Sequence, residues 1–252
     1  YEIRFDEWLA SDEVSSEDKA RLSALSEEEK KEMFFAPLEF GTAGMRGVLD
    51  VGVNRMNMFT VRRATKGLAD YINTLGKEAC GRGVVISYDT RKYSSEFAIE
   101  VAKVLSANGI NAHLFEDVRP VPMCSFAIRR LNAVAGVMIT ASHNPKIYNG
   151  YKVYGEDGAQ MSPESTDKVV KFIDKTPYFG IKCADAKLCA ACIKGKDNVK
   201  FDEHITVIGK SVDDAYFAQL EKLSLSPEAV KSHGAGVKLV YTPIHGSGYM
   251  PV

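Results

Sequence analysis

The sequence has no excess of charge of either sign and no long hydrophobic run. Its 252 residues include 32 Lys and Arg against 33 Asp and Glu, so the formal net charge is -1. A balance this close excludes a polybasic protein held on nucleic acid by general attraction to phosphates, although a local basic site stays possible. No apolar stretch approaches the ~18 residues that a membrane-spanning helix needs, so we expect neither a membrane span nor a nucleic-acid partner.

Cysteine is also scarce. An odd number of cysteines in a chain of this size indicates a reducing compartment, and we therefore expect a cytoplasmic protein. The five are Cys80, Cys124, Cys183, Cys189 and Cys192. The last two form a C-x-x-C pair, but a zinc site would need a second pair of ligands, and His204 is the closest candidate. Ordinary helix residues are the favoured interpretation of this pair.

Short apolar runs alternate with helical patterns along the first two thirds of the chain. Val84–Tyr88, Ala112–Phe115 and Ala133–Thr140 are continuously apolar or nearly so, which is typical of strands covered on both faces. Helical spacing of apolar residues separates them. With 45% hydrophobic residues for a core, this alternation predicts a three-layer α/β/α domain with a mixed, largely parallel sheet.

Helix-start patterns flank this region. Residues 1–35 read as helical, with a capping box at Ser26 and Glu29, and Ser162-Pro163-Glu164 has the same cap, proline and acid order as Ser226-Pro227-Glu228.

Residues 176–206 carry the weakest pattern in the chain, and we expect a domain boundary near residue 208. The prediction is one domain over 1–208 and the beginning of a second, similar domain over 209–252. The second would open with a helix over Ser211–Leu223 and a strand over Val237–Tyr241. On this interpretation the chain is part of a longer protein.

Polar residues follow the third of these strands, where an open α/β sheet binds ligands. The turn reads Ala141-Ser142-His143-Asn144-Pro145. It is either an ordinary polar turn closed by proline or a loop in which Ser142 is a nucleophile or a modified hydroxyl. The flanking Thr140 and Asn144 do not match the G-x-S-x-G elbow of hydrolases.

Three further segments are individually weak. Asp89-Thr90-Arg91 is a helix cap or an anion contact, and residues 40–47, with three glycines around Arg46, lack the Gly-Lys-Ser/Thr ending of a Walker loop. Tyr148–Lys152 contains Asn-Gly, a strong turn signal before a strand. Taken together, these segments place the Ser142 hydroxyl among cationic and imidazole groups, namely Arg46, Arg91, His143 and Lys152. That pattern suits a phosphorylated serine, whereas a hydrolytic triad would need other partners.

These motifs resemble those of the α-D-phosphohexomutases. The phosphoserine loop of that family is resembled by residues 140–145 together with 148–152, and its N-terminal loop by residues 40–47. Residues 89–91 resemble one of its strand ends, and residues 241–246 resemble the opening of its second domain. Residues 38–57 are most similar to the bacterial phosphoglucomutase branch, which is related to phosphoglucomutase-2 and phosphopentomutase.

The resemblance implies an interconversion of sugar 1-phosphates and 6-phosphates through a sugar bisphosphate, with glucose 1,6-bisphosphate as activator. Phosphorylated Ser142 would donate the phosphoryl group, and one phosphate oxygen would be a Mg²⁺ ligand. The resemblance makes His143, Lys152 and Arg46 catalytic together with Ser142. It makes Thr42, Arg91 and Asn144 contacts of the substrate or its phosphate.

The family's aspartate-rich metal loop, D-x-D-x-D-R, is not found in these residues, nor are its sugar-specificity and phosphate-binding loops. We therefore expect the chain alone to be inactive. Phosphomannomutase or phosphopentomutase activity, or a non-catalytic relative that binds sugar phosphates, remain alternatives. A small sugar phosphate is the expected partner, with no obligate protein partner.

Overall fold

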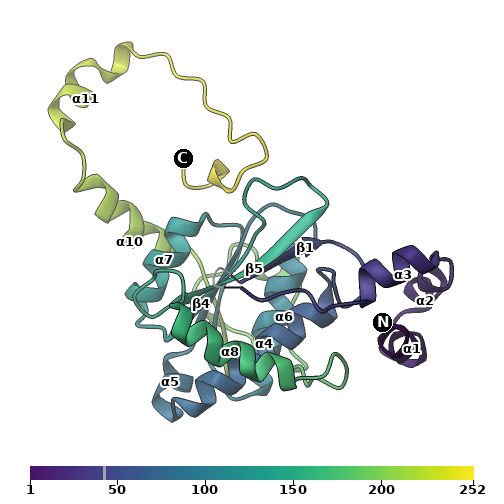
Figure 1. Cartoon of the computed structure of the whole chain (residues 1–252). Coiled ribbons are helices and arrows are strands. Elements are labelled where there is room, and N and C mark those ends of the chain that lie inside the picture. The colour runs from purple at the N-terminus through teal and green to yellow at the C-terminus, as the bar shows by residue number, and fades with distance from the viewer. Residues whose placement is uncertain (42–43) are drawn as a thin grey trace.

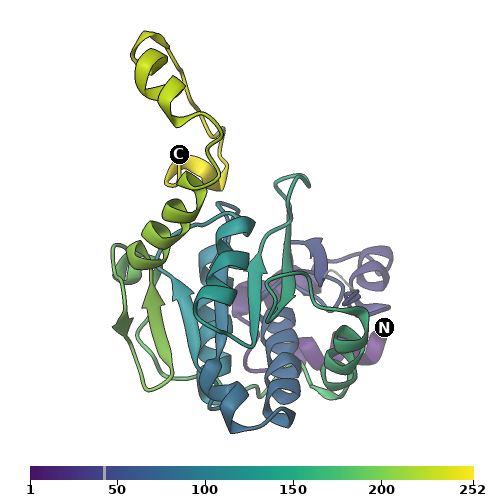
Figure 2. The ribbon, with the colours of Figure 1, turned by 90° about the vertical axis from the view of Figure 1, so that its left-hand side faces the viewer.

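The computed structural model describes residues 1–41 and 44–252, and their strands form one seven-stranded sheet (Figures 1 and 2). The spatial order is β1-β5-β4-β2-β3-β7-β6. The strands are β1 (Met45–Val48), β2 (Val84–Tyr88), β3 (Ala112–Phe115), β4 (Ala135–Ile139), β5 (Tyr148–Gly155), β6 (Val199–Lys200) and β7 (Ile205–Ile208).

The middle of the sheet is parallel and its edges are antiparallel. β4, β2, β3 and β7 run parallel, whereas β5 and β1 continue one edge antiparallel and β6 closes the other. The predicted mixed α/β sheet is confirmed. The parallel strands end at a common edge, where ligands bind in folds of this kind.

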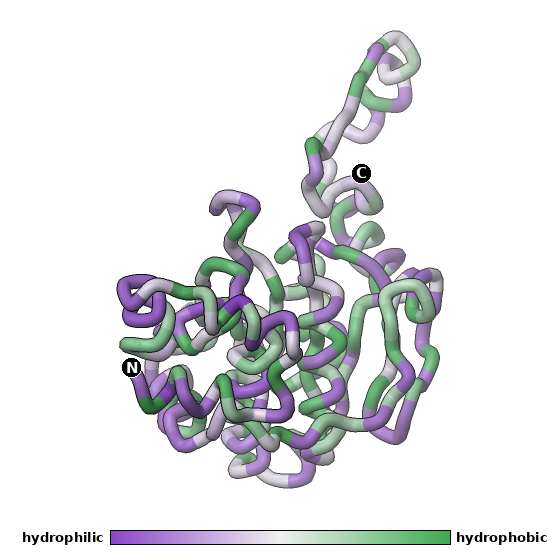
Figure 3. The backbone as a smooth tube through the Cα atoms, turned by 90° about the vertical axis from the view of Figure 1, so that its right-hand side faces the viewer, coloured by the Kyte–Doolittle hydropathy of each residue, from purple (hydrophilic) through white to green (hydrophobic). Residues whose placement is uncertain are grey.

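Helices cover both faces of the sheet, as the three-layer prediction requires. On one face α4 (Met58–Thr74), α6 (Ser94–Ala107) and α8 (Pro163–Lys175) share a core cluster with side chains such as Ile86. On the other face α7 (Val121–Arg130) packs with the neighbouring Val85. Successive strand residues thus point into opposite cores. In Figure 3 hydrophobic segments run through the interior of this body.

The first 35 residues form the predicted helices, α1 (Glu2–Ala10), α2 (Ser16–Ser23) and α3 (Glu27–Phe34). The capping box between Ser26 and Glu29 is present. Trp8 is buried in an aromatic cluster with side chains that include Phe34 and Phe59. The cluster fastens these helices to the start of α4, so they form a group beside the main body (Figure 1).

The predicted turn at Asn149-Gly150 is wrong, because both residues lie inside β5. The Asn149 side chain is buried and donates to the carbonyl oxygen of Lys92 (3.1 Å) and to Ser94 Oγ (3.0 Å). A Cβ on Gly150 would lie 2.7 Å from the carbonyl oxygen of Thr140. Close strand packing, and not a reversal of the chain, explains why these two residues occur here.

β1 and β7 were not predicted. β1 follows the glycine-rich segment and pairs with β5, and β7 lies in the weakly patterned stretch yet is buried between β3 and β6. Short strands of four residues carry little periodicity of their own, and pairing with neighbours decides them. The other short helices are α5 (Lys77–Arg82) and α9 (Ala190–Ile193).

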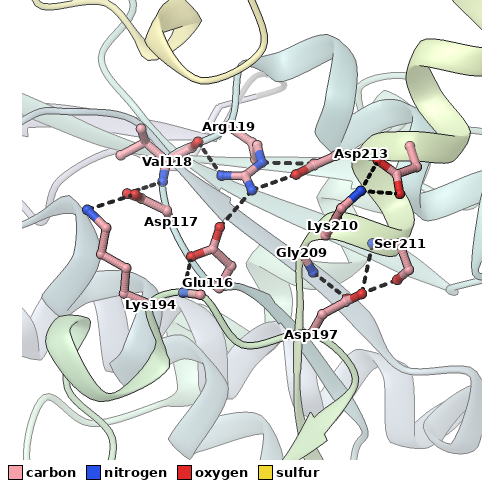
Figure 4. A network of polar contacts seen from close by, with 12 residues as sticks. Glu116, Asp117, Val118, Arg119, Lys194, Asp197, Gly209, Lys210, Ser211 and Asp213 are labelled. Atoms are coloured by element: carbon pink, nitrogen blue, oxygen red, sulfur yellow. Dashed lines mark hydrogen bonds and ion pairs between the residues drawn. The ribbon is translucent and has the colours of Figure 1, made fainter.

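The predicted helix at 211–223 is confirmed as α10 (Lys210–Glu221), which is anchored by a buried ion pair. Arg119 donates to Asp213 (2.7 and 2.9 Å) and to Glu116 (2.8 Å), as Figure 4 shows.

The segment after α10 differs from the prediction. α11 (Pro227–His233) begins where the proline predicts, and it extends away from the body with the residues that follow (Figures 1 and 2). The strand predicted at 237–241 is wrong: these residues pair with no other strand of the described chain, and Val240 is 94% exposed. A strand exists only where a neighbour satisfies its backbone groups. The boundary near residue 208 stays a prediction.

No helix among the described residues is long and apolar enough to cross a bilayer.

Candidate active site

Ser142 stands in the loop that follows β4, at the edge where the parallel strands end. Its φ is 54°, a left-handed conformation that few residues other than glycine adopt. The backbone N–H of Ser142 donates to Thr140 Oγ1 at 2.9 Å, and Thr140 Oγ1 in turn donates to Asp89 Oδ2 at 2.6 Å. This chain of hydrogen bonds stabilises the unusual backbone conformation of Ser142. Ser142 itself is exposed to solvent.

Lys152 lies directly beside this serine. It belongs to β5, where it pairs with Met138 of β4, and its Nζ donates to Ser142 Oγ at 2.9 Å. Partial burial lowers the pKa of Lys152, and the neighbouring positive charge of Arg46 lowers it further. An amine whose pKa is depressed beside a hydroxyl can both donate a proton to that oxygen and take one from it.

Arg46 reaches the same loop from β1. Strand β1 pairs antiparallel with β5, with Arg46 opposite Gly150, and Arg46 Nη1 donates to Asn144 Oδ1 at 2.7 Å. The guanidinium is exposed at the site. Although 98 residues separate Arg46 from Asn144, the two side chains meet because β1 is added to the sheet beside β5. His143 is exposed and lines the neighbouring cleft.

Arg91 has a different environment from the one its sequence position predicts. Its Nη1 donates to the carbonyl oxygens of Pro145 (3.0 Å) and Tyr148 (3.1 Å), and its Nη2 to those of Ser142 (2.7 Å) and Asn144 (2.6 Å). The guanidinium therefore holds the backbone of the serine loop. That Arg91 contacts a phosphate stays a prediction.

Asp89 organises the same loop, a role that the sequence did not predict: there it was part of the segment 89–91, interpreted as a helix cap, an anion contact or the family's strand end. Its Oδ1 accepts from the backbone N–H of Arg91 (3.0 Å) and from Ser94 Oγ (2.9 Å), and its Oδ2 accepts from Thr140 Oγ1. Asp89 Oδ2 also lies 3.5 Å from Arg91 Nε. Its place directly after a buried strand was the available signal for this role.

Several of these residues line a cleft of about 1120 Å³, and Arg46 and Lys152 are bonded to the serine loop that forms part of its wall. Its lining includes Arg91, Thr140, Ser142, His143, Asn144 and His245. The structure thus brings together every predicted site residue except Thr42, which lies outside the described residues. A cleft with several cationic groups around one hydroxyl suits a phosphorylated ligand.

The described residues do not form a magnesium site. Mg²⁺ requires several oxygen ligands, usually with one or two carboxylates. Asp89, the carboxylate linked to Ser142 through Thr140, already accepts hydrogen bonds on both oxygens. Across residues 1–41 and 44–252 no group of three or more His, Cys, Asp and Glu could hold a metal ion.

The fold and the site define an α/β protein with a serine at the carboxyl edge of its sheet, which accepts a hydrogen bond from a lysine and is flanked by arginines. Residues 37–178 match the family described as phosphoglucomutase/phosphomannomutase, alpha/beta/alpha domain I. This match covers more than half of the chain, and the chain belongs to that family.

Similar proteins agree with this assignment. The chain is 39% identical over 224 residues to a phosphoglucomutase of Staphylococcus saprophyticus, which covers 88% of the chain and 37% of that relative. It is 48% identical over 148 residues to a phosphoglucomutase of Staphylococcus epidermidis, with 59% of the chain and 27% of the relative covered. The chain therefore spans well under half the length of these relatives.

Solved structures show the same fold. A putative phosphomannomutase from Thermus thermophilus aligns with a TM-score of 0.57 at 26% identity, over 75% of this chain and 36% of that one. A phosphoglucomutase from Paramecium, parafusin, aligns with a TM-score of 0.61 at 19% identity, over 84% and 40%.

Proposed function

We propose that this chain carries the phosphoserine of a phosphohexomutase, which moves a phosphoryl group between the 1- and 6-positions of a hexose phosphate through a sugar bisphosphate. The observation that carries the proposal is the 2.9 Å hydrogen bond from Lys152 Nζ to Ser142 Oγ, on a serine held in a left-handed conformation. Family membership and the phosphoglucomutase relatives support glucose phosphates as the substrate class.

Lys152 has a defined part in this reaction. When phosphorylated Ser142 gives its phosphoryl group to a sugar hydroxyl, that hydroxyl loses its proton to a nearby base or to water, while Ser142 Oγ leaves with negative charge and takes a proton from Lys152 Nζ. In the reverse transfer Lys152 accepts the serine proton as Oγ attacks the sugar phosphate. The lowered pKa of Lys152 brings its proton affinity closer to neutral pH, which favours both directions.

Arg46 and Asn144 hold the geometry and the charge around the transferring group. The exposed guanidinium of Arg46 stands at the serine loop, and its bond to Asn144 fixes its direction. Positive charge preorganised at this place stabilises the charge on the equatorial oxygens. His143 lines the cleft and faces the ligand space.

Magnesium is the expected cofactor of such an enzyme, with glucose 1,6-bisphosphate as activator. The described residues offer the Ser142 hydroxyl, or the phosphate on it, as an oxygen ligand, and Mg²⁺ would need carboxylates that these residues do not supply. No step is therefore derived through the metal. All five cysteines are free, which supports the proposed cytoplasmic location.

The test is phosphorylation of Ser142. The full-length protein is incubated with glucose 1,6-bisphosphate and its intact mass is measured. We expect one added phosphate that Ser142→Ala abolishes and that the control Ser23→Ala, an exposed serine of α2, retains. A coupled glucose 1-phosphate assay should show a loss of about 10³-fold or more for Ser142→Ala. A Ser142→Ala protein that is still phosphorylated and active overturns the proposal.

The 252-residue chain is then assayed by itself. Because residues 1–41 and 44–252 supply no group of carboxylates for magnesium, we expect no turnover above background at saturating Mg²⁺. Turnover at an enzyme-like rate would show that the chain builds a metal site that its described residues do not reveal.

A further inference from the structure

The C-x-x-C pair, Cys189 and Cys192, occupies a single tight turn. Cys189 is the residue before α9, and Cys192 is the third residue of that helix. The backbone N–H groups of Cys192 and Ile193 both donate to the carbonyl oxygen of Cys189, at 3.1 and 3.2 Å. A turn closed in this way brings the first and fourth Cα atoms within about 7 Å, a separation close to that which a disulfide spans.

The two sulfur atoms lie against each other's backbone. The N–H of Cys189 donates to Cys192 Sγ at 2.7 Å, and the N–H of Cys192 donates to Cys189 Sγ at 3.2 Å. Cys192 Sγ is also 3.0 Å from the carbonyl oxygen of Cys189, to which its thiol donates. Both sulfur atoms therefore lie within the same turn.

The two thiols of this pair are accessible to solvent, whereas the thiol of Cys124 is not. Cys189 is exposed and Cys192 half-buried, whereas Cys124 is fully buried, and burial raises the pKa of the Cys124 thiol to about 12. At Cys189 the neighbouring Cys192 side chain lowers the pKa of the thiol, and so does the Cys192 backbone N–H, which donates to the Cys189 sulfur. A thiol of lowered pKa at the start of a turn is the reactive member of a C-x-x-C pair.

The turn is fastened to the sheet beside the candidate active site. Immediately after α9, Lys194 Nζ lies 3.2 Å from Asp117 Oδ2, and the N–H of Gly195 donates to Glu116 Oε2 at 2.7 Å. Figure 4 shows the ion pair between Lys194 and Asp117.

The two alanines between the cysteines face the residues that hold the serine loop. Ala190 and Ala191 line a cavity of about 300 Å³ together with Asp89, Thr90 and Arg91. A change in the turn therefore alters a surface shared with the residues that position Ser142.

We propose that Cys189 and Cys192 are a dithiol modification site that forms a reversible intramolecular disulfide, with a small-molecule disulfide such as oxidised glutathione as the oxidant. The Cys189 thiolate attacks one sulfur of glutathione disulfide, which forms a mixed disulfide and releases one glutathione. The Cys192 thiolate then attacks the Cys189 sulfur and releases the second. Two protein thiols are oxidised, one glutathione disulfide is reduced to two glutathiones, and both thiol protons pass to solvent or to the released thiolates.

Oxidation removes the thiol hydrogen through which Cys192 bonds to the carbonyl oxygen of Cys189. The turn must then hold together through the S–S bond and its backbone hydrogen bonds. The turn that is rebonded in this way carries Ala190 and Ala191, which line the cavity beside Arg91.

The experiment equilibrates the purified chain in buffers of increasing oxidised-to-reduced glutathione ratio, quenches with acid, and alkylates the remaining thiols after denaturation. The reduced chain has five thiols and takes up five alkyl groups. We expect the oxidised chain to take up two fewer, with no glutathione retained, and dithiothreitol to restore all five. Peptide mass mapping should locate the crosslink between Cys189 and Cys192.

Matched variants assign the pair. Cys192→Ser should stop at the mixed disulfide on Cys189 and retain one glutathione, whereas Cys80→Ser and Cys183→Ser should still lose two alkylation sites. The proposal is overturned if all thiols stay reactive in every buffer, if the crosslink joins another cysteine, or if the wild-type chain retains glutathione. The readout is mass alone, so its failure leaves the proposed mutase function untouched.

Discussion

Arg91 Nη2 donates to the carbonyl oxygen of Ser142 at 2.7 Å. This bond to the backbone of the proposed nucleophile is one of four that Arg91 donates to carbonyl oxygens of the loop. Its fork of N–H groups matches these carbonyls in a way that a single ammonium cannot.

Arg91→Lys should therefore lower kcat of the complete enzyme by about 10²-fold, because a serine displaced by ~1 Å is poorly aligned for transfer. KM should change much less, since the arginine donates to the loop. Steady-state kinetics on the purified variant measure both. Arg82→Lys is the matched control, because Arg82 donates to Asn132 and Glu156 at the other end of the strands. A variant with unchanged kcat and raised KM would make Arg91 a phosphate ligand instead.

Lys152→Met should remove activity and raise stability near neutral pH. The folded state lowers the pKa of Lys152 below its ordinary value of 10.5. Between the lowered and the ordinary pKa the unfolded chain binds more protons than the folded one, so stability increases with pH over that range. The stability is fully present above the ordinary pKa and is lost as pH falls through the lowered value.

The methionine variant has no such loss. Its advantage over the wild type, measured by denaturant unfolding, should be present at pH 7 and shrink toward pH 10.5. An advantage that is constant with pH would show that packing, and not the charge of Lys152, causes it.

Gly150→Ala tests the close approach of three strands. The added Cβ would lie 2.7 Å from the carbonyl oxygen of Thr140 and 2.8 Å from that of Met45, and neither backbone atom can rotate away. We expect a destabilisation of about 1–3 kcal/mol, with a displaced serine loop and reduced activity. In Gly81→Ala, a helical position with no atom within 4 Å of the new Cβ, stability should be unchanged or higher by up to ~1 kcal/mol. Equal effects of the two changes would contradict the strand contact.

Arg119→Met tests the buried anchor of α10. The side chains of Arg119, Glu116 and Asp213 are 2%, 9% and 15% exposed, so methionine would leave two carboxylates largely buried without their cation. Loss of one partner from such a group costs about 3–5 kcal/mol, which urea unfolding measures. Arg130→Met, at an exposed end of α7, should stay within about 0.5 kcal/mol. A small effect at Arg119 would show that water replaces the guanidinium.

Much of the fold was predictable because it rests on local signals. The continuous apolar run at Val84–Tyr88 is a buried central strand, and the cap and proline at Ser162-Pro163 begin α8. The strand predicted at Val237–Tyr241 has the same local character and is absent, because no neighbouring strand satisfies its backbone. Asn149-Gly150 is the opposite case: its local pattern predicts a turn, but both residues lie in β5 because the neighbouring strands pack closely there.

In the candidate site, too, some features follow from the sequence and others from the tertiary structure. The sequence by itself determined which chemical groups are present: a serine at the end of a strand, with histidine, asparagine and lysine nearby and arginines in two other motifs. Only the tertiary structure decided how they act. The antiparallel register of β4 and β5 places Lys152 against Ser142, and the addition of β1 places Arg46 against Asn144. Contacts between residues far apart in the chain depend on strand order, and no local pattern encodes strand order.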